Sequence, residues 1–161
     1  MPARRPKPKV LISSSQRAVR VPRKKIAELV GFVARREGAR VAEVDLAVVA
    51  ADEIAGLNRR YLGHGGATDV LSFDLSEAGR PSAASGVERG GLSVQLVICG
   101  DVTAAQAAAR GLAVQRELLL YVVHGLLHQM GYEDSSIRGA AKMHARQEEL
   151  LEEFLRSRRR S

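Results

Sequence analysis

The stretch 118–134, LLLYVVHGLLHQMGYED, constrains the fold of this chain most, because a long apolar run carries a few polar groups at its end. His124 and His128 are four residues apart, and on a helix this spacing places both imidazoles on one face. Gly131 predicts the end of that helix, and two acidic residues follow in the expected turn. Two histidines and one carboxylate could converge on a divalent ion and leave a position open for water, as in hydrolytic zinc sites.

The same spacing also fits a purely structural pair of histidines. A zinc peptidase would read HExxH, with the glutamate as general base, whereas this chain has Gly125 at that position. A glycine inside a helix costs about 1 kcal/mol relative to alanine. Gly125 therefore indicates either close packing against a neighbouring helix or an opening through which a substrate approaches the metal. Glu117, two turns before His124 on the same face, either orients that histidine or meets solvent.

The segment HGLLHQMGYED resembles the signature of the YbeY family, the bacterial rRNA maturation factors and metal-dependent endoribonucleases. The family signature usually reads HGxLHLxGYDH and supplies three histidine ligands. His124 and His128 match the first two, Asp134 stands at the third, and Glu133 stands at the aspartate. The resemblance implies a metal site of His124, His128 and Asp134. It implies zinc as the cofactor, and the carboxylate ligand leaves manganese or magnesium open.

A second stretch resembles the same family, whose pattern there is LNxxYR, a short loop and TDVLSF. The matching residues are Leu57, Asn58, Tyr61, Thr68, Asp69, Val70, Leu71, Ser72 and Phe73. The arginine that the family uses in RNA cleavage is replaced by Leu62. Arg59 and Arg60, one turn earlier, are candidate catalytic substitutes, or else part of a solvated helix face. Asp69 and Ser72 are candidates for residues on the substrate side of the site.

Turn signals divide the chain into alternating elements. A strand is expected at 10–13, a helix from Pro22 to about Gly38, a strand at 44–49 and a helix at 53–61 capped by Asp52. Strands at 69–73 and 93–99 are separated by a Ser- and Gly-rich connection. Three helices follow: one capped by Asp101, one from Val114 and one over 137–155. This order predicts an α+β fold, a small mixed sheet of about four strands with helices packed on it.

Basic residues gather at the two ends of the chain. No acid precedes Glu28, and that segment holds nine lysines and arginines, while four arginines lie between Arg156 and Arg160. The expected organisation is a disordered basic arm at 1–9, a single catalytic domain at 10–155 and a basic tail at 156–161. Such ends either contact a polyanion or are solvated tails.

The rest of the composition narrows the class of protein. A chain of 161 residues can bury the core of one domain, and its one cysteine, Cys99, excludes an internal disulfide. We therefore expect a cytoplasmic protein. The N-terminus has no apolar segment typical of a secretory signal, and no run approaches the roughly 20 apolar residues of a membrane span.

Together these features predict a metal-dependent endoribonuclease that cleaves single-stranded RNA. By resemblance, it acts in rRNA maturation and ribosome quality control, with ribosomal RNA and ribosomal proteins as expected partners and without a membrane. One alternative is a metal-dependent hydrolase of another substrate, such as a peptide. The other is a non-catalytic RNA- or ribosome-binding protein whose metal is structural.

Overall fold

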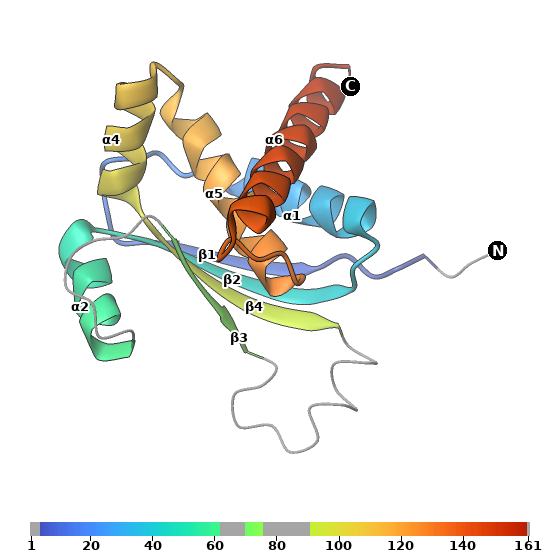
Figure 1. The fold of residues 1–161 in the computed structure, drawn as a ribbon, viewed down its shortest axis with the longest axis horizontal. Helices are drawn as coiled ribbons and strands as arrows, with labels where there is room; N and C mark the ends of the chain where they lie inside the picture. Colours follow the sequence, from blue (N-terminus) through green and yellow to red (C-terminus); the bar gives the residue numbers. More distant parts are fainter. Residues whose placement is uncertain (1–3, 62–69, 76–90, 161) are drawn as a thin grey trace.

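The structure is a computed structural model that describes residues 4–61, 70–75 and 91–160, without the side chains of residues 58, 60 and 61. A mixed four-stranded sheet carries helices on both faces, which confirms the predicted α+β class (Figure 1). The predicted order of elements is also confirmed: β1 (Lys9–Ser14), α1 (Arg23–Glu37), β2 (Val41–Val49), α2 (Ala51–Tyr61), β3 (Val70–Asp74), β4 (Leu92–Cys99), α4 (Gly100–Arg110), α5 (Val114–Gln129) and α6 (Ile137–Arg159).

The strands lie in the order β1-β2-β4-β3. β1, β2 and β4 run parallel to one another, and β3 runs antiparallel to β4 at one edge of the sheet. α1 forms the crossover between the parallel strands β1 and β2 (Figure 1). This arrangement gives β4 a central position, with β3 beside it.

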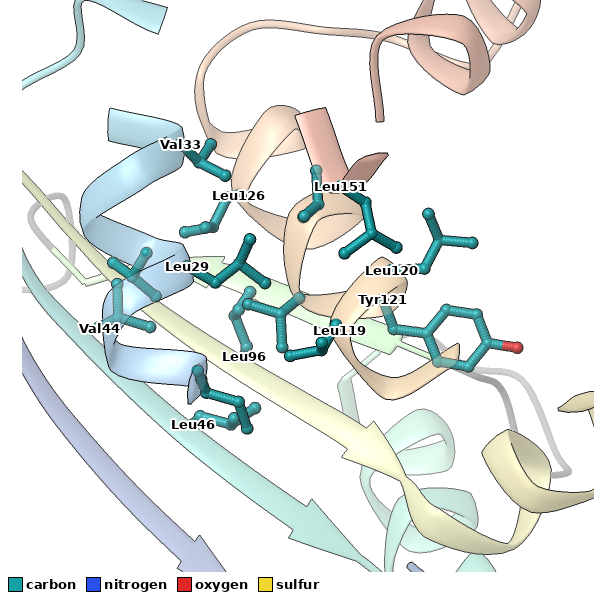
Figure 2. Packing of buried hydrophobic residues seen from close by; sticks show 14 of the residues in the cluster. Leu29, Val33, Val44, Leu46, Leu96, Leu119, Leu120, Tyr121, Leu126 and Leu151 are labelled. Atoms are coloured by element: carbon teal, nitrogen blue, oxygen red, sulfur yellow. The ribbon is translucent and has the colours of Figure 1, made fainter. Parts of the chain in front are cut away.

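The main core lies between one face of the sheet and the helices α1, α5 and α6. Alternate residues of β2 and β4 point into it, as expected for the period of two along a strand. α5 is buried around most of its circumference because α1, α6, β3 and β4 all contact it. Figure 2 shows this packing for Leu29, Val33, Val44, Leu46, Leu96, Leu119, Leu120, Tyr121, Leu126 and Leu151.

A smaller core lies on the other face of the sheet, under α2. Ile54 of α2 is fully buried there and packs with Leu71 and Val97, which belong to β3 and β4. Because strand side chains alternate between faces, α2 lies on the face opposite α5. The exposed side chain of Arg59 is carried by this helix.

Two predicted helix caps are wrong in their details. α2 begins at Ala51, so Asp52 lies inside its first turn, and α4 begins at Gly100 without a side-chain cap. The Asp101 carboxylate instead accepts a hydrogen bond of 2.8 Å from the backbone N–H of Ala51. Asp101 therefore caps α2 across the sheet end, because the two helix starts are neighbours in space and far apart in sequence.

The last helix is longer than predicted. α6 continues past Leu155 to Arg159, so Arg156, Arg158 and Arg159 lie in its final turn. Positive side chains are stabilising there because the C-terminal end of the helix dipole is negative. The division into arm, domain and tail is otherwise still a prediction. Among the described residues, no helix combines the length and hydropathy that a membrane span requires.

Candidate metal centre

The chain reverses direction at the end of α5, and this turn positions the candidate ligands. Gly131 has φ 103°, a left-handed conformation that glycine adopts without a steric penalty. Its N–H donates to the carbonyl of His128 at 3.2 Å, and the N–H of Tyr132 donates to that of Leu127 at 3.0 Å. These are the two hydrogen bonds of a Schellman motif, so the predicted helix stop at Gly131 is confirmed.

The far end of the same turn is fixed by the start of α6. Ser136 is the N-cap of α6, and its hydroxyl accepts a hydrogen bond of 2.9 Å from the N–H of Gly139. A Cβ at Gly139 would lie 2.5 Å from the carbonyl oxygen of Glu133, so only glycine admits this close approach. The segment that contains Asp134 is therefore held at both of its ends.

His124, His128 and Asp134 meet in one cluster. Their candidate ligand atoms all lie within 4.8 Å of one another. Asp134 Oδ2 is 3.3 Å from His128 Nε2 and 3.9 Å from His124 Nε2. Ligands about 2.0–2.2 Å from a tetrahedral ion lie roughly 3.3 Å apart, so small side-chain shifts would let all three reach one ion. Nitrogen and carboxylate oxygen donors suit zinc or another divalent transition metal.

Solvent reaches this cluster. The side chains of His124 and His128 are each 30% exposed, and that of Asp134 is 50% exposed. Three protein donors in an accessible position leave room for a further ligand, which is the arrangement of catalytic rather than structural zinc sites. The cluster could thus hold a metal ion and still admit a small molecule or part of a polymer substrate.

Gln147 on α6 fixes the orientation of His124, a role that was not predicted from the sequence. His124 Nδ1 lies 2.9 Å from Gln147 Oε1, and Gln147 is 8% exposed. A carbonyl oxygen can only accept, so Nδ1 donates this hydrogen bond, and in the neutral imidazole the Nε2 lone pair faces the cluster. Metal-ligating histidines commonly have such a partner on the other ring nitrogen. The available signal was a polar residue in the buried stripe of α6, between Met143 and Leu150.

An ion-pair network keeps α6 against α5. Arg116 of α5 donates to Glu152 at 2.7 Å and to Glu148 at 3.2 Å, both on α6. These hydrogen bonds, with the Glu152 bond as the largest cause, raise the pKa of the Arg116 guanidinium against the opposing effect of burial. The Arg116 hydrogen bond also lowers the pKa of the Glu152 carboxyl. Glu148 is adjacent to Gln147, so the network supports the contact with His124.

The two open interpretations of Gly125 and Glu117 are now decided. A Cβ at Gly125 would lie 2.6 Å from Leu96 Cδ2 of β4, so Gly125 permits close packing, against the sheet rather than against a helix. The peptidase base of HExxH therefore has no room at this position. Glu117 neither orients His124 nor meets solvent: it is fully buried and pairs with Arg110 of α4 at 3.5 Å.

The remaining predicted site residues are placed unevenly. Ser72 of β3 accepts a hydrogen bond of 3.0 Å from Gln129, the residue after His128, so it lies beside the candidate site. Arg59 is exposed on α2, on the other side of the sheet. The side chain of Arg60, together with Leu62 and Asp69, lies outside the described residues. The catalytic roles of these residues therefore stay predictions.

A second polar network connects the turn after α5, which carries Asp134, to the end of α1. The Tyr132 hydroxyl donates to Glu37 Oε2 at 3.0 Å, and Arg146 Nε donates to Glu37 Oε1 at 2.6 Å. Burial raises the pKa of the Tyr132 phenol, and the Glu37 carboxylate raises it further. The Glu37 side chain is only 12% exposed. Its two hydrogen bonds connect α1, the turn after α5 and α6 at the edge of the site.

The fold and the cluster define a class: an α+β domain with an accessible site, at the end of a buried helix, that could hold one divalent ion. A family model described as Endoribonuclease YbeY matches residues 11–155. The chain is 41% identical over 115 residues to the endoribonuclease YbeY of Renibacterium salmoninarum, covering 70% of this chain and 73% of that protein. It is 35% identical over 133 residues to that of Bacillus subtilis, covering 81% and 85%.

The chain therefore belongs to the endoribonuclease YbeY family. The fold agrees with the solution structure of TM1509 from Thermotoga maritima, with a TM-score of 0.59 over 93% of this chain and 91% of the other. At 22% identity, this similarity concerns the fold alone.

Proposed function

We propose that this chain is a metal-dependent endoribonuclease that cleaves single-stranded RNA with one divalent ion, zinc, held by His124, His128 and Asp134. The observation that carries the proposal is the convergence of these three side chains in a member of an endoribonuclease family. An ion at this position would lower the pKa of a bound water towards about 7 and polarise a phosphoryl oxygen.

The protein's own residues supply geometry and access. The two histidines are held by a buried helix, and Gln147 keeps the lone pair of His124 Nε2 directed at the cluster. Asp134 contributes negative charge from a turn that is fixed at both ends. The exposed side of the cluster gives a scissile phosphate a route in, and Ser72 and Gln129 lie next to that route.

The cellular role belongs to the same proposal. We infer action on ribosomal RNA in maturation and ribosome quality control, in the cytoplasm, with ribosomal proteins as further partners. The family supports this role, and the single cysteine, which is buried, supports a reducing compartment. The basic arm at 1–9 and the basic tail at 156–161 would hold RNA phosphates around the scissile one.

The experiment compares metal content and substrate class in one preparation purified without a histidine tag. Elemental analysis is expected to give about one zinc per chain, as for single-ion hydrolytic sites. The protein should cleave unstructured RNA and leave denatured casein intact, and chelator should abolish cleavage. Chelator-sensitive proteolysis without RNA cleavage would mean that the protein is a peptidase and not a ribonuclease. Full RNA cleavage by metal-free, folded protein would mean that the reaction does not need the metal.

A further inference from the structure

The segment before β1 lies along the outer face of α1 and encloses grooves rich in positive charge. One groove of about 620 Å³ lies between residues 4–8, the second half of α1 and the start of β2. Its cations are Arg4, Arg5, Lys7, Arg35 and Arg40, and its described lining includes no acid. We call this groove and its continuation along α1 the basic groove.

The continuation is a second groove of about 560 Å³ that shares Lys7, Pro8, Gly31 and Arg35 with the first. It extends along α1 to Lys24 and reaches the end of α6. Lys24 and Arg35 are eleven residues apart, which corresponds to roughly 16 Å along a helix. The length of the basic groove therefore suits an extended polyanion better than an isolated phosphate ion.

Two cations of the basic groove, Lys24 and Arg35, differ from other basic residues nearby in their lack of an acidic partner. Arg36 pairs with Glu153 at 3.2 Å, and Arg158 pairs with Glu28, the acid in the lining. The side chains of Lys24 and Arg35, in contrast, are exposed and have no ion pair or hydrogen bond with any residue that the structure describes. Concave surfaces lined by one sign of charge concentrate the potential that attracts a polyanion.

A third groove lies between the basic groove and the end of α5. It measures about 430 Å³ and is lined by Arg40, which also lines the basic groove, and by Gln129 and Met130 at the end of α5. The acid in its lining, Glu37, is paired with Arg146. Gln129 follows the candidate ligand His128 directly in the chain. The three grooves thus follow one another from α1 to the end of α5, the helix that carries His124 and His128.

We propose that the basic groove binds the phosphodiester backbone of single-stranded RNA, and that the bound strand passes Arg40 and Gln129 to reach the metal cluster. This inference rests on the proposed function, because it gives the substrate strand a second binding surface outside the cluster. Backbone contacts from lysine and arginine position a strand without reading its sequence. The groove would therefore strengthen binding of any single-stranded RNA and leave the chemical step unchanged.

The test measures RNA binding by the full chain in chelator, where no strand is cut. Fluorescence anisotropy with a labelled unstructured RNA is recorded over a salt series for the wild type, Arg35→Gln and Arg17→Gln. Arg17 is the matched control, because it is exposed and lines none of the three grooves. Removal of one phosphate-binding cation should reduce the log–log salt slope by roughly 0.7. We expect this change for Arg35→Gln, about twice it for Lys24→Gln/Arg35→Gln, and none for Arg17→Gln.

With metal restored, the groove variants should raise KM for RNA several-fold with kcat unchanged. Equal salt slopes for Arg35→Gln and Arg17→Gln would overturn the proposal. So would a dependence on Arg35 seen with phosphatidylserine vesicles but not with RNA, which would identify a membrane surface instead. The binding measurement does not need catalysis. If the protein binds RNA through Arg35 but never cleaves it, the proposed function is refuted and the proposal that the basic groove binds RNA is retained.

Discussion

Asp134 and Glu133 are adjacent acids in one turn, yet only Asp134 has its carboxylate among the histidines. Asp134→Ala should lower zinc affinity by more than the roughly 10–100-fold that loss of a supporting hydrogen bond costs. Glu133→Ala should change it little, and Asp134→His should keep or tighten it by restoring a three-histidine set. Competition with a chromogenic chelator measures all three. Loss of zinc in Glu133→Ala with retention in Asp134→Ala would mean that Glu133 is the ligand.

Gln147 gives a test of how His124 is held. Gln147→Leu keeps the site buried but removes the acceptor for His124 Nδ1–H, so zinc affinity should fall roughly 10–100-fold. Gln147→Glu still accepts that hydrogen bond and should restore most of the affinity. Gln106→Leu, at an exposed position on α4, is the matched control and should bind zinc as the wild type does. Lower stability of Gln147→Leu with normal zinc affinity would mean that Gln147 contributes to the packing of α6 and does not orient His124.

At the scale of single elements, the left-handed turn after α5 connects backbone conformation to the site. Gly131→Ala should lower the free energy of unfolding by about 1–2 kcal/mol, because an alanine with φ near 103° is strained. The same variant should weaken zinc binding, since the turn places Asp134.

The control for that variant is Gly111→Ala, at the end of α4, where φ is 66°. Both variants should be destabilised in urea unfolding, but only Gly131→Ala should also lose zinc affinity. Equal zinc affinities in the two variants would mean that Asp134 reaches the histidines independently of the turn.

The raised pKa of Tyr132, which burial causes first and the Glu37 hydrogen bond second, predicts a pH dependence of stability. The folded protein raises the pKa of Tyr132, so the phenol form is stabilised. Its contribution is complete below the unfolded pKa of about 10 and is lost as pH rises through the folded value. Tyr132→Phe should lower the free energy of unfolding by about 1 kcal/mol at neutral pH. In urea unfolding from pH 7 to 11, this difference should shrink only at the alkaline end; a constant difference would contradict the assignment.

At the scale of the whole molecule, local signals in the sequence predicted much of the fold. Gly38 ends α1 with φ 64°, and Val114 begins α5 where it was expected. The resemblance to a known family also selected His124, His128 and Asp134, which the structure brings together. These predicted helix boundaries succeeded, and the three candidate ligands meet, because each depends on residues close together in the chain.

Long-range partners could not be predicted in the same way. Asp101 caps a helix that begins 50 residues earlier, and Gln147 meets a histidine 23 residues earlier. Nor does a strand's own sequence specify its neighbour, so the central place of β4 between β2 and β3 needed the structure. The basic arm likewise had no predicted position, and the grooves along α1 depend on it.

The central claim is that one ion held by His124, His128 and Asp134 cleaves single-stranded RNA, and a metal titration of RNA cleavage tests it most directly. Zinc is added back to metal-free wild type, His124→Ala and His144→Ala, all checked for folding by circular dichroism. His144 is an exposed histidine of α6 outside the cluster and serves as the matched control. We expect cleavage by the wild type and His144→Ala to rise with bound zinc up to about one ion per chain, and His124→Ala to stay inactive. Full cleavage by His124→Ala, or by metal-free wild type, would contradict the account.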